Sequence, residues 1–156
     1  MNNKNSFMLR AIELSIESVD NSGGPFGCVI VKNNKIIAEG NNQVTNLNDP
    51  TAHAEIVAIR NACKSINNFN LEGTEIYTSC EPCPMCLSAI YWSHIDKIYY
   101  GNTRVEAANI GFDDNHIYEE LNKELSTRLI PMEQINKNDA IKAFKKWELK
   151  VDKKEY

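Results

Sequence analysis

The feature that most constrains this chain is a pair of short clusters rich in metal-binding side chains. The first, at residues 51–55, reads TAHAE, and the second, at residues 79–86, reads SCEPCPMC. Three of the five cysteines lie in the second cluster, a spacing that suits a metal ion better than a disulfide framework. Each cluster opens a run with helical spacing, so a fold that uses both for one ion must bring two helix beginnings together.

The two clusters supply the ligands that zinc prefers. Tetrahedral zinc takes Cys and His, and a catalytic site keeps three protein ligands and leaves the fourth position to water. His53, Cys83 and Cys86 make that number. The two cysteines share one helix face at i and i+3, and the positive end of a helix favours thiolate. The spacing alone leaves the choice of thiols open, because Cys80 as a fourth ligand would make the site structural.

Glu55 is a carboxylate that the three-ligand set does not use, so it is available for catalysis. Its spacing of two residues from His53 sets a geometric condition. Residues two apart in a helix interior are turned by about 200° and cannot share a site. Both must therefore lie at the mouth of a helix. Pro50 agrees with this, because proline is favoured where a helix begins.

Hydrophobic spacing predicts an alternation of helices and strands. The expected helices cover residues 6–20, 52–66, 82–92, 104–109 and 116–122. A last amphipathic helix is expected from the apolar residues at positions 141, 144, 147 and 151. The expected strands are 27–32, 35–39, 74–79, 96–101 and a short one around 129–135. The first helix has apolar positions at Met8, Ile12, Ile16 and Val19. We expect one α/β domain, residues 1–156, with a mixed sheet between helical layers.

Charge and hydrophobic content argue against nucleic-acid-binding and membrane proteins. The 17 Lys and Arg against 21 Asp and Glu give a net charge of −4, which disfavours a general nucleic-acid binder. Residues 137–156 carry seven Lys against four acids, which we interpret as the solvated face of an amphipathic helix that buries Phe144 and Trp147. With no apolar run near about 20 residues and no signal peptide, we expect no membrane association and a cytoplasmic location.

The order of the two motifs leads to a family. H-x-E followed by P-C-x-x-C is the signature of zinc nucleobase deaminases, and the chain has both halves, at 53–55 and 82–86. The chain resembles the cytidine-deaminase-like superfamily and, within it, the bacterial guanine deaminases. That narrower resemblance includes PFG at 25–27, NDPTAHAE at 48–55, SCEPCPMC at 79–86, GFDD at 111–114 and KKEY at 153–156. The tRNA adenosine deaminases have closely similar metal motifs.

The resemblance implies a three-layer α/β/α fold with a mixed central sheet, and hydrolytic deamination of guanine to xanthine and ammonia. It selects His53, Cys83 and Cys86 as ligands of one catalytic zinc per subunit, with Glu55 and Asp114 as catalytic residues. The implied substrate-binding residues are Phe26, Asn42, Ala54, Trp92, Asp114 and Tyr156. In that family the C-terminal segment, here about 137–156, is exchanged between subunits, so we expect a homodimer acting on a small purine.

Other interpretations stay open beside this one. The chain could deaminate guanosine, cytosine or tRNA adenosine, or it could be a structural zinc module that mediates an interaction without turnover. Trp92 could belong to the core, and Asp114 could lie in a solvated turn. The role of Tyr156 depends wholly on the resemblance. The remaining cysteines are expected to be small buried apolar residues; they are Cys28, Cys63 and Cys80.

Overall fold

The computed structural model describes residues 3–156, which divide into two compact units. The first unit ends at Asp114 and the second is Asn115–Tyr156. Within the described residues, none of the helices has both the length and the apolar character needed to cross a lipid bilayer. The two units are described separately below.

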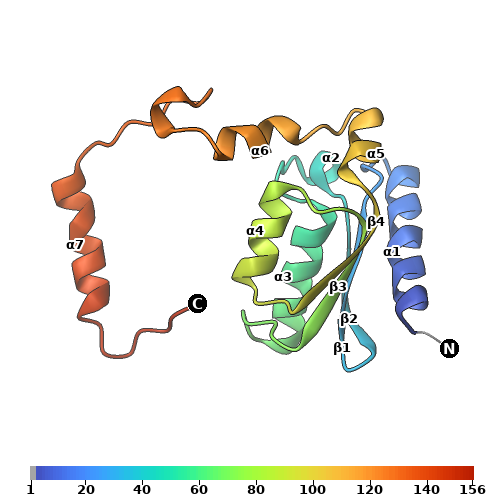
Figure 1. The fold of residues 1–156 in the computed structure, drawn as a ribbon. Helices are drawn as coiled ribbons and strands as arrows, with labels where there is room; N and C mark the ends of the chain where they lie inside the picture. Colours follow the sequence, from blue (N-terminus) through green and yellow to red (C-terminus); the bar gives the residue numbers. More distant parts are fainter. Residues whose placement is uncertain (1–2) are drawn as a thin grey trace. The chain divides into compact units, whose positions relative to one another are not determined.

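The first unit is built on a mixed four-stranded sheet with the order β2-β1-β3-β4 (Figure 1). Its strands are β1 (Gly27–Lys32), β2 (Lys35–Asn41), β3 (Thr74–Cys80) and β4 (Lys97–Asn102). β1 pairs antiparallel with both β2 and β3, whereas β3 and β4 are parallel. The predicted hairpin is confirmed: Asn33 and Asn34 join β1 to β2 with φ angles of 50° and 60°, as its tight turn requires.

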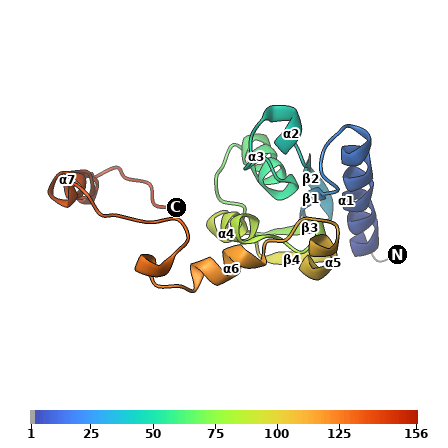
Figure 2. The same cartoon turned by 90° about the horizontal axis from the view of Figure 1, so that it is seen from above.

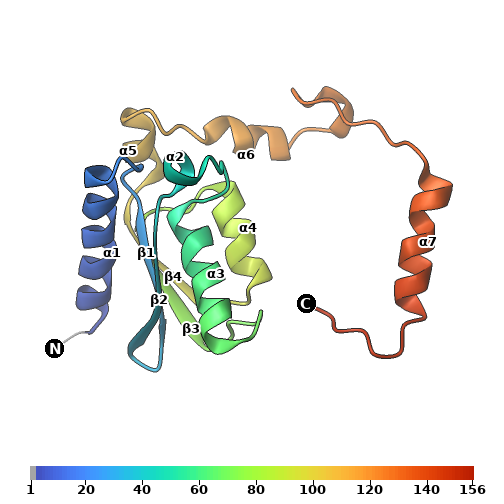
Figure 3. The same ribbon diagram turned by 180° about the vertical axis from the view of Figure 1, so that it is seen from behind.

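Helices cover both faces of this sheet and complete the predicted three layers. α1 (Asn3–Asp20) lies against one face, and α3 (Ala54–Ile66) lies with α4 (Pro84–Trp92) on the other (Figures 2 and 3). β1 is buried along almost its whole length because it is central in the sheet and covered on both sides. The expected α/β fold with a mixed sheet between helical layers is confirmed.

The connecting segments differ from the sequence prediction in two places. The predicted strand around 129–135 is wrong, because that stretch of the second unit has no regular structure. Pro131 lacks the N–H that a strand ladder needs there. The polar loop after β2 contains the single-turn helix α2 (Val44–Leu47), which is too short to show a period. The other elements are α5 (Arg104–Asn109), α6 (Asn115–Leu121), the 3-10 turn Leu125–Thr127 and α7 (Lys137–Glu148).

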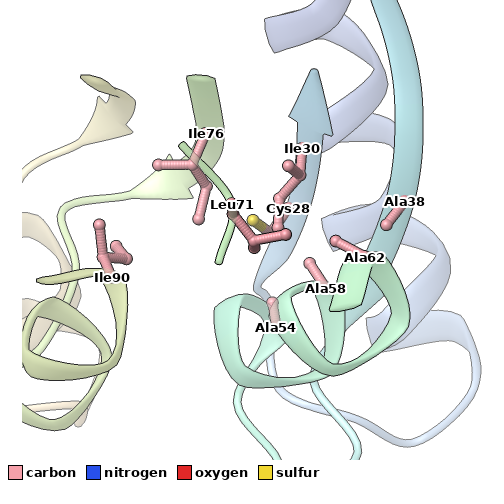
Figure 4. Close-up of a cluster of buried hydrophobic side chains, with 9 residues drawn as sticks. All are labelled: Cys28, Ile30, Ala38, Ala54, Ala58, Ala62, Leu71, Ile76 and Ile90. Carbon is pink, nitrogen blue, oxygen red and sulfur yellow. The ribbon is translucent and has the colours of Figure 1, made fainter. Parts of the chain in front are cut away.

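Small side chains hold α3 directly on the sheet. Figure 4 shows Ala54, Ala58 and Ala62 on the face of α3 that is turned toward Cys28 and Ile30 of β1. Four-residue spacing places the three alanines in one row along the helix. Gly40 of β2 completes this contact, because a Cβ there would meet the Ala54 carbonyl oxygen and lie 2.6 Å from the Ala58 nitrogen.

α1 buries a different stripe from the predicted one, which ran through Met8, Ile12, Ile16 and Val19. The buried side chains are Phe7, Ala11, Leu14 and Ser18. Ile16 and Val19 remain 57% and 53% exposed. The helix carries two stripes at helical spacing, and the stripe with small residues allows close approach, because a Cβ on Gly27 of β1 would meet the Ala11 carbonyl oxygen. Periodicity alone cannot choose between two such stripes.

The contact at Gly40 gives a stability prediction. Gly40→Ala forces α3 away from β2, and overpacking of this kind costs about 1–3 kcal/mol of unfolding free energy. Urea denaturation followed by circular dichroism measures the loss. Lys35→Ala, at an exposed position of the same strand, serves as the control and should change stability by less than about 0.5 kcal/mol. Equal stability of the two variants would contradict the close helix–sheet contact.

Candidate metal centre and active site

Two helix beginnings position the predicted metal ligands. His53 is the N-cap residue of α3, with φ −68° and ψ 157°, and Cys83 is the N-cap residue of α4, with φ −66° and ψ 168°. Both have extended rather than helical backbones, and Pro84 occupies the start of α4, where a missing N–H leaves no helical bond unmade. His53 and Glu55 thus lie at the mouth of α3, as their spacing requires.

His53, Cys83 and Cys86 converge on one point. Their ligand atoms all lie within 4.8 Å of one another, and each sulfur is 3.6 Å from His53 Nδ1. Among the residues that the structure describes, this is the group of three or more such side chains close enough to hold a metal ion. One imidazole and two thiols form a donor set that suits zinc.

Cys80 lies outside this group. Its thiol donates to the Thr103 carbonyl oxygen at 3.7 Å, and burial raises its pKa to about 11, so the group stays a thiol. The geometry therefore assembles three ligands and gives Cys80 another contact, which argues against the four-ligand structural site. Cys28 is buried as expected, but Cys63 is only partly buried.

The two clustered cysteines share one negative charge. A hydrogen bond from Cys86, together with one from His53, lowers the pKa of Cys83 to about 4 despite its partial burial. The neighbouring Cys83 and burial raise the pKa of Cys86, and the hydrogen bond to Cys83 raises the pKa of His53. Of the two thiols, Cys83 is therefore the one that more readily ionises.

Glu55 is a buried carboxyl group beside this cluster. It belongs to the first turn of α3 and is only 6% exposed. Burial raises its pKa, although hydrogen bonds from its own backbone, Cys86 and Thr78 oppose that effect. The Thr78 hydroxyl lies 3.0 Å from Oε1. A carboxyl group with a raised pKa is suited to take and return protons near neutral pH.

Asn42 and Phe26 come from neighbouring segments of the first unit. Asn42 follows β2 and is buried, and its Oδ1 accepts the backbone N–H groups of Gly24 at 3.3 Å and Val44 at 3.2 Å. These two bonds fix the orientation of the amide, since only its oxygen can accept them. Phe26 packs edge to face against Phe112, with ring centroids 4.9 Å apart.

Asp114 lies within electrostatic reach of the metal cluster. Burial raises its pKa, the Cys83 thiolate raises it further, and Arg104 opposes the shift. The side chain is half-buried rather than fully solvated. Phe112, two residues earlier, links this segment to Phe26 through the aromatic contact. The structure therefore brings Asp114 within electrostatic range of Cys83 and joins Phe26 to the segment just before Asp114. Sequence reasoning missed Phe112.

Three other predicted substrate contacts differ in burial. Trp92 ends α4 and is 64% exposed, so its interpretation as a core residue is wrong. Tyr156 belongs to the second unit and is exposed in the single chain. Ala54 is buried as the first residue of α3. The roles of all three in binding a substrate stay predictions.

Comparisons with known proteins agree with these motifs. Residues 1–102 match the family of the cytidine and deoxycytidylate deaminase zinc-binding region. Guanine deaminase from Bacillus subtilis strain 168 is 48% identical over 155 residues, which cover 99% of both chains. Its X-ray structure superimposes with a TM-score of 0.96 over 100% of this chain and 99% of that one.

Other relatives match a smaller share of the chain. The tRNA-specific adenosine deaminase of Aquifex aeolicus is 40% identical over 97 residues, which are 62% of this chain and 64% of that protein. The guanine deaminase structure from Nitrosomonas europaea is 30% identical, with a TM-score of 0.67 over 69% of this chain and 63% of that one. The chain therefore belongs to the zinc-binding cytidine and deoxycytidylate deaminase family and, within it, to the guanine deaminases.

Proposed function

We propose that this protein is a zinc-dependent hydrolase that converts guanine and water to xanthine and ammonia. One observation carries the proposal: a buried carboxyl group lies beside a convergent His-Cys-Cys group, in a chain 48% identical to a guanine deaminase over nearly its whole length. The reaction breaks the C–N bond to the exocyclic amine and forms a C–O bond at the same ring carbon. It would serve purine breakdown and salvage.

The donor set fits one zinc ion per subunit. His53, Cys83 and Cys86 would hold it, since their three ligand atoms already converge and one thiol is ionised without metal. Bound zinc would supply Lewis-acid chemistry that makes water a nucleophile near neutral pH. Two thiolates would offset its charge of +2.

Glu55 would move the protons. The attacking water must lose a proton, the ring must gain one at nitrogen, and the amine must leave as ammonia. A buried carboxyl group with a raised pKa, close to the metal ligands but not one of them, can perform these transfers in sequence. We propose Glu55 as the general acid and base, with Asp114 helping to hold or protonate the leaving amino group.

The remaining site residues would bind the purine. Asn42 uses its amide oxygen within the protein, so its NH2 group is the part left to donate a hydrogen bond to the ring. Phe26 and Trp92 would form walls of the pocket, and Ala54 would line it beside Glu55. Tyr156 would close the pocket.

The second unit supports a homodimer with exchanged C-terminal segments. No residue of α7, all of which the structure describes, is buried, and Phe144 and Trp147 are 73% and 43% exposed. The expected burial of this apolar face is thus not achieved by the single chain. We propose one deaminase domain per copy, with residues of about 137–156 covering the partner's site. Free thiols at all five cysteines agree with a reducing cytoplasm.

Replacement of Glu55 tests the central assignment. Glu55→Gln keeps the shape but cannot carry the proton, so guanine turnover should fall by at least about 100-fold while zinc content is unchanged. Ammonia release and metal analysis measure the two quantities. Glu72→Gln, at an exposed loop position, should behave like the unaltered protein.

The same assay should use guanosine, cytosine, adenine and a tRNA substrate beside guanine. Faster release from any of these would contradict guanine as the preferred substrate. A variant without Glu55 that deaminates normally would contradict the proton-transfer role. An intact protein that binds zinc and releases no ammonia would favour the structural interaction module.

Zinc binding should depend on pH. Metal binds only to deprotonated ligands, and the pKa values of His53 and Cys86 are raised in the metal-free site. Zinc affinity should therefore increase as pH rises from about 6 to about 8, with protons released on binding. Competition with a chelating dye, and proton release in weak buffer, check this. Binding without pH dependence would contradict the proposed ligand set.

Deletion of residues 153–156 tests the tail. Turnover of guanine should fall without loss of zinc, because Tyr156 would be missing from the pocket. Mixing the deletion variant with the Glu55→Gln variant distinguishes exchange of tails between subunits from closure of each site by its own tail. If the tails are exchanged, the mixed dimer contains one site in which an intact Glu55 is covered by the intact tail of the other subunit. Restored activity supports exchange, whereas two inactive partners that stay inactive after verified mixing contradict it.

A further inference from the structure

Thr78 of β3 has a buried hydroxyl group that donates a hydrogen bond to Glu55 Oε1 at 3.0 Å. Both side chains are almost fully inaccessible to solvent, so no water can replace either partner freely. Thr78 lies outside both sequence motifs that define the metal site. Thr78 follows Ile76 by two residues in β3, so both side chains lie on the sheet face that α3 covers.

The strand holds this hydroxyl firmly. Thr78 pairs with Cys28 of β1 on one side and with Tyr100 of β4 on the other, so it sits inside the sheet rather than at an edge. Threonine is also stiff at χ1, because two heavy atoms branch from its Cβ. A donor on such a support can fix a carboxylate more accurately than a donor on a loop.

The other side-chain donor to Glu55 is the thiol of Cys86. A cysteine must give up its proton to bind a metal, so this thiol cannot donate once Cys86 serves as a ligand. The Thr78 hydroxyl keeps its proton in either state. Of the two side-chain donors, Thr78 is therefore the one that is not itself a proposed metal ligand.

We infer that Thr78 is a positioning residue: by holding Oε1 of Glu55, it directs the other carboxylate oxygen, Oε2, to the reacting water and base. Oε2 then takes one proton from the water and returns it to the ring nitrogen, while Oε1 remains the anchor. The inference rests on the proposed function, because it assigns a part to the same general acid and base.

Thr78→Val tests this with little change of shape. The hydroxyl is replaced by a methyl group, so kcat should fall by about 10- to 100-fold while KM changes by less than about twofold and zinc content stays the same. Thr78→Ser retains the hydroxyl and should restore kcat to within about threefold. Crystal structures of both variants add a readout independent of activity: the Glu55 carboxylate should rotate in Thr78→Val and keep its place in Thr78→Ser.

Thr74→Val is a matched control in the same strand. Thr74 is equally buried, lies four residues away on the same face, and donates its hydroxyl to the Leu71 carbonyl oxygen at 2.6 Å. Loss of that bond should lower the melting temperature and leave kcat unchanged. A similar fall in kcat for Thr74→Val and Thr78→Val would mean that general destabilisation explains the effect.

Two results would overturn the inference. One is Thr78→Val with a kcat within about threefold of the unaltered protein at full zinc content, and the other is an unmoved Glu55 carboxylate in its crystal structure. Failure of the proposed function looks different, because the unaltered protein would then not deaminate guanine. In that case kcat of the variants is compared on the base that the unaltered protein does deaminate. If it deaminates none, the position of the Glu55 carboxylate in the crystal structures of the variants tests the inference.

Discussion

The close contact between α3 and the sheet fixes the positions of His53 and Glu55, on which the rest of the site depends. Ala54 and Ala58 let the helix backbone rest against Gly40, and the first turn of that helix carries Glu55 two residues after His53. A larger side chain on either surface would separate helix and sheet and would move these two residues together. The second helix beginning, at Cys83, follows β3 after a short loop, so both arrive at the same end of one sheet.

The electrostatic character of the site follows from the same arrangement. Burial favours the neutral form of Glu55, whereas the hydrogen bonds around Cys83 favour its thiolate. Glu55 and Cys83 thus differ in the form they favour, protonated for Glu55 and ionised for Cys83, because their surroundings differ. Such a separation suits one group to ligate a cation and the other to exchange protons.

Much of the fold and the site can be predicted from the sequence. The helices, the hairpin and the three layers follow from periodicity and turn residues. The two motifs supply the candidate ligands, and the family resemblance selects Cys83 and Cys86 over Cys80 to join His53. The buried face of α1 could not be predicted, because the helix carries two apolar stripes at helical spacing, one with Phe7 and Leu14 and the other with Ile12 and Ile16. The choice depends on Gly27, which belongs to another element. Thr78 was missed for a similar reason, because its partner is 23 residues away in sequence.

The backbone bonds to Asn42 also bear on selectivity. With its oxygen occupied by Gly24 and Val44, the amide can offer only hydrogen atoms to whichever edge of a ring it faces. A carbonyl or bare nitrogen at that edge would be accepted, whereas an exocyclic amine would set two donors against each other in a dry pocket. Mispairing of this kind is penalised more strongly than a poor fit of shape, so in the proposed role of Asn42 these two main-chain hydrogen bonds would help the enzyme to reject wrong bases.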